Sequence, residues 1–245
     1  MNWSGELLKV VVYPAELSQD AGELYELVTN SSPDIVARAK LPPPLMSQAS
    51  GDSDGLGIAV IVQPGRLELV LTNLDPEPTQ PSPIPLMSAE LLNEATSRAR
   101  AYAKRLHSLG KVHRAAGHAQ LVQDADSAEN ATKLVNDIVG NAFPESARDV
   151  LFQLNVRREF KGGGTMNRIV KVGQTSLISV QVNLDVAAQR MPTTRGGQRH
   201  LAYMHLDLNS KHEDVAFEAE RANEMSEDIW DEIQRIRERG LDVLG

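Results

Sequence analysis

The sequence predicts an α+β protein in which a curved antiparallel sheet packs against long helices. Two observations favour this class. Short runs rich in β-branched residues are joined by turn-forming residues, and they are interspersed with segments of helical periodicity. With 245 residues, 41% of them hydrophobic, the chain is long enough to bury a substantial core. It contains no cysteine, which excludes disulfide scaffolds, thiolate-held metals and thiol catalysis.

The first half, residues 1–108, is predicted to contain a strand, a helix, three strands and a long helix. The first strand, Leu7–Tyr13, is rich in valine and stops at a proline, which removes the next ladder donor. Ser18 is the predicted N-cap of the helix 19–28, whose apolar residues share one face. The same signals predict a weak strand at 35–41, a mobile loop at 42–57, a hairpin of 58–63 and 67–73, a proline-rich connector at 75–85 and a helix from Ser88 to about Ser108.

The second half, residues 109–245, is predicted to contain a strand, a helix, four strands and a final long helix. Ser127 caps the helix that ends at Val139, and an apolar seam runs along the last helix, about 213–239. The predicted strands are 111–123, 150–160, 166–172, 176–185 and 200–208, with turns at Gly162-Gly163-Gly164 and Gly173-Gln174 and a polar loop at 186–199.

The two halves therefore agree in element order, either as two similar units or as one continuous domain. This order, which covers most of the chain, resembles that of the TATA-binding-protein-like and helix-grip folds, in which antiparallel strands curve around a long helix. The resemblance rests on element order without a diagnostic motif. It implies an architecture and leaves the function open, because one fold serves many functions.

Charge is distributed unevenly along a chain whose net charge is -8. The segment 157–200 contains eight basic and two acidic residues, whereas 201–245 contains twelve acidic and five basic ones. The basic segment is one candidate site for a phosphate backbone or another polyanion, because arginine matches phosphate geometry. The alternative is neutralisation by the acidic side chains of the terminal helix, which would otherwise lie in solvent. The candidate polyanion contacts are Arg157, Lys161, Lys171, Arg190, Arg195 and Arg199.

No segment has the pattern of a known catalytic or cofactor site, and we predict no cofactor and no catalytic residue. The three glycines at 162–164 precede a predicted strand, so they lack the helix that a phosphate cradle needs. His205 and Asp207 share one face of a predicted strand and are the best local pair for a metal. Two ligands are fewer than a zinc site uses, so a hydrogen-bonded pair is the preferred interpretation.

The leading functional hypothesis is a non-catalytic binding protein that acts as a subunit or accessory factor of a cytosolic assembly. Trp230 in the terminal helix and Trp3 near the N-terminus are its candidate protein-interface residues, as exposed anchors for a protein partner or a second copy of the chain. The first alternative is binding of nucleic acid or another polyanion through 157–200. The second is a small-ligand pocket between the sheet and a long helix.

Location and origin are also expectations from composition. No uninterrupted apolar stretch is long enough to span a membrane, and the N-terminus lacks the pattern of a secretory signal, so we expect a cytoplasmic protein. The 17 arginines against 8 lysines favour a bacterial source.

Overall fold

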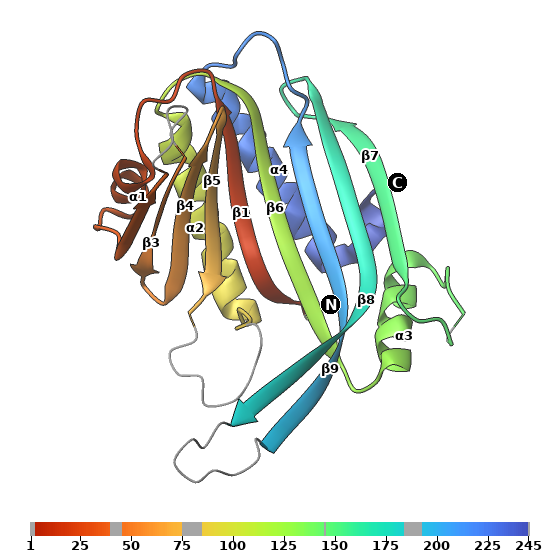
Figure 1. Cartoon of the computed structure of the whole chain (residues 1–245). Helices are drawn as coiled ribbons and strands as arrows, with labels where there is room; N and C mark the ends of the chain where they lie inside the picture. The colour runs from red at the N-terminus through yellow and green to blue at the C-terminus, as the bar shows by residue number, and fades with distance from the viewer. Residues whose placement is uncertain (1–2, 40–45, 75–84, 145, 184–192, 245) are drawn as a thin grey trace.

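The structure, a computed structural model, describes residues 3–39, 46–74, 85–144, 146–183 and 193–244, and only the backbone of 178–183 and 193–197. Within these residues, nine strands form one antiparallel sheet and four helices accompany it (Figure 1). The predicted α+β class is confirmed, and two of the four described helices are long.

The strands are β1 (Ser4–Pro14), β2 (Ile35–Arg38), β3 (Ser47–Ser53), β4 (Leu56–Gln63), β5 (Arg66–Asn73), β6 (Val112–Ala125), β7 (Leu151–Glu159), β8 (Thr165–Asn183) and β9 (Thr193–Ser210). The helices are α1 (Ala21–Thr29), α2 (Ala89–His107), α3 (Ala128–Val139) and α4 (Ala219–Arg239), followed by a short 3-10 helix, η1 (Gly240–Leu244). Ser88 and Ser127 cap α2 and α3, as the sequence predicts.

The strands lie in the order β2-β3-β4-β5-β1-β6-β9-β8-β7, and every neighbouring pair is antiparallel. The two strands that begin the predicted halves, β1 and β6, are therefore direct neighbours inside the sheet. Five strands precede α2 and four follow it, whereas the sequence predicted four and five. The difference comes from β3, which was not predicted, and from β8, which was predicted as two strands.

All four described helices pack on the same face of the sheet, and no described helix covers the other face, which we call the uncovered face (Figure 1). Gly117 of β6 lies under α4, where a Cβ atom would come within 2.7 Å of Ile229 Cγ2. Val10 and Leu208, its cross-strand neighbours, belong to the same buried core. The small-ligand hypothesis placed a pocket between the sheet and a long helix. Closely packed side chains fill that space instead.

The predicted loop at 42–57 contains a strand, which corrects the sequence analysis. Ser47–Ser53 pairs with both β2 and β4. Its small residues have low strand propensity, but they allow α1 to pack closely on the sheet. A Cβ atom on Gly51 would lie 2.7 Å from the Tyr25 hydroxyl of α1. Residues 42–45 of this loop lie outside the described residues.

The turn predicted at Gly173-Gln174 is also wrong, because β8 continues through both residues. Gly173 pairs with Leu151 on one side and with Tyr203 on the other. A Cβ atom there would lie 2.5 Å from the Tyr203 hydroxyl, so the position accommodates a neighbouring ring. A glycine within a strand often marks such a close approach. The strand 200–208 is likewise longer, since β9 begins at Thr193 within the predicted polar loop.

Two helix starts differ from the predictions. The N-cap of α1 is Asp20 and not Ser18, because the Asp20 carboxylate accepts hydrogen bonds from the backbone of Gly22 and Glu23 and completes a capping box. The terminal helix α4 begins at Ala219 and not near Glu213. Phe217 holds the preceding segment in a β-bridge with Val112, which delays the start of the helix.

Candidate functional site

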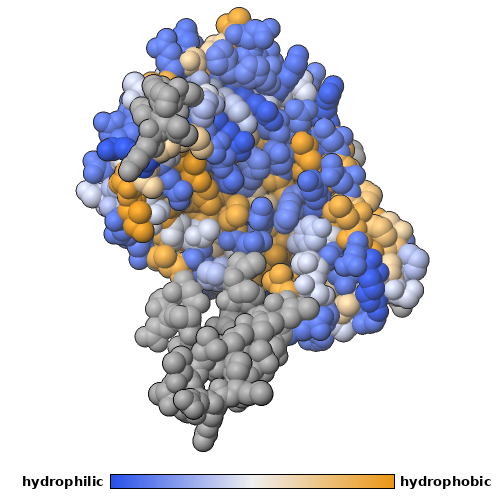
Figure 2. Space-filling view, in the orientation of Figure 1, coloured by the Kyte–Doolittle hydropathy of each residue, from blue (hydrophilic) through white to orange (hydrophobic). Residues whose placement is uncertain are grey.

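The uncovered face of the sheet contains a hollow with two adjoining compartments over β6, β9 and β8. One compartment, the more polar of the two, has a volume of about 340 Å³, and the other has about 250 Å³ and a mostly apolar lining. They meet at Gln120 and His205, which line both. Figure 2 shows hydrophobic and hydrophilic residues side by side over this face, with no helix in front of them.

Two cross-strand pairs form the polar compartment. His118 of β6 lies directly opposite Asp207 of β9, with 3.6 Å between His118 Nε2 and Asp207 Oδ1. Burial lowers the pKa of His118, and the nearby Asp207 charge opposes that shift only in part. Asn209 Nδ2 donates a 2.8 Å hydrogen bond to Asp207 Oδ1. The Asp207 carboxylate therefore accepts a hydrogen bond from the neutral Asn209 amide, while His118 is unprotonated at neutral pH.

The second pair lies one pleat further along the same strands, about 7 Å away. His205 of β9 faces Gln120 on β6 and Lys171 on β8. Burial, together with the charge of Lys171, lowers the pKa of His205. The imidazole ring of His205 also packs against Tyr203, with 4.8 Å between ring centroids. His205 is thus a neutral group at the boundary between the polar and the apolar compartment.

The apolar compartment lies on the far side of His205. Its aliphatic lining consists of Leu86, Val122, Leu177 and Leu201. Tyr203 and Thr175 add a phenol and a hydroxyl group, Arg199 borders it, and Glu6 of β1 contributes a carboxyl group. Burial raises the pKa of Glu6 and also that of Tyr203, so the phenol is neutral at pH 7.

The candidate polyanion contacts that the structure describes lie in different places. Arg157 and Lys171 are exposed on the uncovered face, and neither makes an ion pair with a described residue. Arg199 binds Asp124 through Nε and Nη2, at 2.7–3.0 Å. Arg190 lies outside the described residues, as does the side chain of Arg195. The sixth residue, Lys161, contacts α4.

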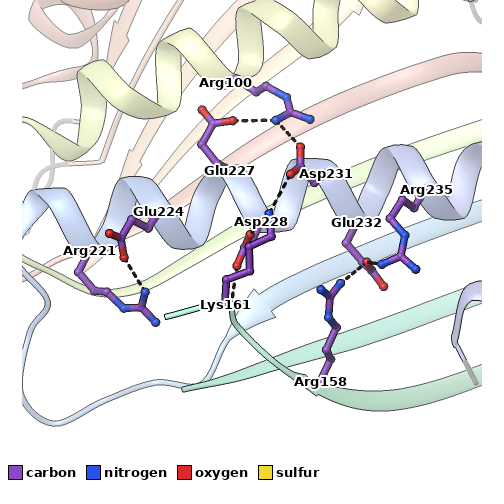
Figure 3. A network of polar contacts seen from close by, with 10 residues as sticks. All are labelled: Arg100, Arg158, Lys161, Arg221, Glu224, Glu227, Asp228, Asp231, Glu232 and Arg235. Atoms are coloured by element: carbon purple, nitrogen blue, oxygen red, sulfur yellow. Dashed lines mark hydrogen bonds and ion pairs between the residues drawn. The ribbon is translucent and has the colours of Figure 1, made fainter. Parts of the chain in front are cut away.

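A network of ion pairs joins the basic segment to α4 (Figure 3). Lys161 Nζ lies 2.8 Å from Asp228 Oδ1, and its backbone N–H donates to the same carboxylate. Glu232 has a side-chain exposure of 0% and binds Arg158, Arg168 and Arg235 at 2.5–2.8 Å. Neutralisation by the terminal helix therefore applies to this part of the segment. The predicted solvated face of α4 contains a buried carboxylate, although Glu227 and Glu224 are exposed.

The two tryptophans are not surface anchors. Trp230 is 1% exposed and Trp3 is 3% exposed, and both belong to the hydrophobic core. Large apolar side chains are exposed instead on the edge strand β2, where Ile35 is 64% and Val36 is 45% exposed. Both indoles therefore contribute to packing of the core, and neither is accessible to a protein partner.

The metal candidates His205 and Asp207 do share the uncovered face, and His118 lies close to Asp207. Nevertheless, within the described part of the chain no three histidine or carboxylate side chains are arranged to hold a metal ion. His205 faces Lys171, whose positive charge disfavours a cation at that point. Among the described residues, His205 and Asp207 therefore lack the further ligands that a zinc site needs.

Most of the residues that line the hollow were not candidates from the sequence, among them His118, Gln120 and Glu6. The alternation of β6 indicates which residues share a face, but the partner strand of β6 follows only from the sheet order. Glu6 faces the hollow because the register of β1 shifts between Gly5 and Leu7, a bulge for which the sequence gives no signal.

Comparisons with protein-family models, with curated proteins and with solved structures gave no match for this chain. No helix among the described residues has the length and apolar character needed to cross a membrane.

Proposed function

We propose that the protein binds a small ligand with an apolar body in the hollow on the uncovered face of the sheet. The observation that carries this proposal is the pair of adjoining compartments. An aliphatic lining with a few convergent polar groups and buried titratable side chains is typical of small-ligand sites. The proposal keeps the small-ligand alternative and moves its pocket from the helix side of the sheet to the opposite face. It assigns no reaction to the site.

The contacts around the apolar compartment support a preformed site. Leu201 is 3% exposed and Val122 is 4% exposed, so the walls are held by the fold before any ligand arrives. Tyr203 is fixed above Gly173, which has no side chain to displace it. A preformed apolar site loses little conformational entropy on binding, which favours affinity for a small molecule.

The test is a fluorescence titration with N-phenyl-1-naphthylamine, a neutral apolar probe that brightens in apolar surroundings. We expect saturable binding of one probe, which Thr175→Phe abolishes because the ring fills the apolar compartment. The matched control is Thr165→Phe, on the same strand but outside both compartments. Absence of saturable binding, or equal loss in both variants, would contradict the proposal.

Polyanion binding is a second candidate, favoured by the exposed cations Arg157 and Lys171 on the uncovered face. Labelled duplex DNA would be titrated by fluorescence anisotropy between about 50 and about 200 mM salt. Arg157→Gln with Lys171→Gln should flatten the slope of log affinity against log salt by about one unit per lost phosphate contact. Lys133→Gln on α3 is the matched exposed control. Binding that is independent of salt would eliminate this candidate.

We also propose the finer fold assignment, TATA-binding-protein-like or helix-grip. It is supported by the antiparallel sheet with β1 and β6 side by side inside it and with the described helices on one face. A solved structure with a different sheet order would refute this assignment.

A further inference from the structure

The carboxyl group of Glu6 has no partner within the described residues, although it is partly buried at the wall of an apolar compartment. The bulge between Gly5 and Leu7 directs this side chain toward the hollow. Bulges are frequent next to functional sites because they re-aim a side chain. Placing a carboxylate there without a counter-charge is unfavourable for folding, and burial is the one cause that shifts the pKa of Glu6 upward.

The other titratable groups that line the same compartment do not balance the charge of Glu6. Arg199 is bound in a bidentate manner by Asp124. Tyr203 and His205 are neutral at pH 7, because burial raises the pKa of the phenol and lowers that of the imidazole. Among the described residues that line this compartment, Glu6 is therefore the charged group with no oppositely charged side chain to pair with.

From these contacts we infer that the ligand is an amphipathic cation: an amine joined to an apolar body. This inference rests on the proposed small-ligand function and specifies its ligand class. The ammonium group donates charge-assisted hydrogen bonds to the Glu6 carboxylate, and the apolar body packs against Val122, Leu177 and Leu201. The ion pair is stronger here than in water, because the aliphatic walls lower the local dielectric constant.

Lys171 defines the competing possibility, since a negatively charged head group would be attracted to it. Its side chain is exposed and lines the polar compartment, beyond His205 as seen from Glu6. Asp207 also lines the polar compartment and offsets part of that positive charge. An exposed lysine is solvated by water, whereas a partly buried carboxylate gains more from a counter-charge. The charge of Glu6 therefore decides the preference.

The test compares three probes of equal length, octylamine, octanol and octanoate, as competitors of bound N-phenyl-1-naphthylamine at pH 7. All are kept below the concentrations at which they aggregate. We expect octylamine to displace the probe at a concentration about tenfold lower than octanol does, with octanoate weakest. Glu6→Gln should make octylamine and octanol displace the probe at similar concentrations, because the charge that distinguishes them is gone. The matched control is Glu16→Gln, an exposed glutamate near α1 that lies outside the hollow.

The outcomes separate this inference from the proposed function. Equal displacement by all three probes, or strongest displacement by octanoate, overturns the inference and leaves small-ligand binding intact. Failure of N-phenyl-1-naphthylamine to bind at all overturns the proposed function itself. Unchanged octylamine preference in Glu6→Gln, with circular dichroism confirming the fold, also overturns the inference. Its loss in Glu16→Gln as well would assign the effect to net charge and would overturn it too.

Discussion

The buried carboxylate of Glu232 gives the sharpest stability prediction, through the substitution Glu232→Gln. Glu232 is 0% exposed, and Arg168, one of its three partners, has a side-chain exposure of only 7%. Removing the carboxylate charge leaves the Arg168 guanidinium buried without a counter-charge, which costs about 3–5 kcal/mol. Arg158 and Arg235 are 34% and 43% exposed, so water replaces their lost ion pair at about 1 kcal/mol or less each.

The expected loss in the free energy of unfolding is therefore about 4 kcal/mol, which for a chain of this length lowers Tm by about 8–16 °C. The assay is urea unfolding at pH 7, followed by the fluorescence of the two buried tryptophans, Trp3 and Trp230, and by circular dichroism. Glu227→Gln is the matched control on the same helix. Glu227 is 54% exposed and pairs with Arg100, so its loss should cost less than about 1 kcal/mol.

A double variant tests the physical reason. Arg168→Met combined with Glu232→Gln removes both buried charges and should regain part of the stability lost by Glu232→Gln alone. The reasoning would be refuted if Glu232→Gln cost no more than Glu227→Gln. It would also be refuted if the double variant lost the sum of the two single effects, because independent residues would then be additive.

Three further predictions concern packing, pH and capping. Gly117→Val should destabilise by about 1–3 kcal/mol in urea unfolding, because its Cβ atom would lie 2.7 Å from Ile229 Cγ2. Burial lowers the pKa of His107 below its usual 6.5, so its contribution to stability is complete above pH 6.5 and declines as the pH falls through that value. His107→Gln should therefore reduce the loss of Tm between pH 7 and pH 5, and an unchanged loss would refute this assignment. Asp20→Ala should cost about 1 kcal/mol by removing the cap of α1, whereas an unchanged Tm would mean that Glu23 alone satisfies the helix end.

Local signals were enough to predict much of the fold. The Pro64-Gly65 turn between two apolar runs predicted the hairpin of β4 and β5, and Ser88 and Ser127 predicted two helix starts. The segment Ser47–Ser53 was missed because its strand character comes from packing against α1 and not from propensity. Gly173 was misread as a turn because the ring that requires its small size is 30 positions away, on Tyr203.

The candidate site was less accessible to prediction because its contacts are between strands that are distant in sequence. Alternation placed His205 and Asp207 on one face, but the proximity of His118 depends on β6 and β9 being neighbours. The charge pattern indicated that the basic segment and the terminal helix could pair, and the register of β8 then decides that Arg168 points toward α4 while Lys171 points away. Periodicity assigns each residue of a strand to one face of the sheet, and only the order and register of the strands determine which side chains meet.

The position of α4 has a consequence for how the chain folds during synthesis. The apolar surface of β6 around Gly117 is covered by α4, whose residues 219–239 are made after all the strands of the sheet. Until α4 is made, the apolar surface that it covers on β6 and β9 has no partner among the strands and helices already synthesised. Burial of that face therefore waits for contacts that are far apart in sequence, and such contacts form slowly. A nascent chain stopped before α4 exposes this surface and is the form most in need of a chaperone.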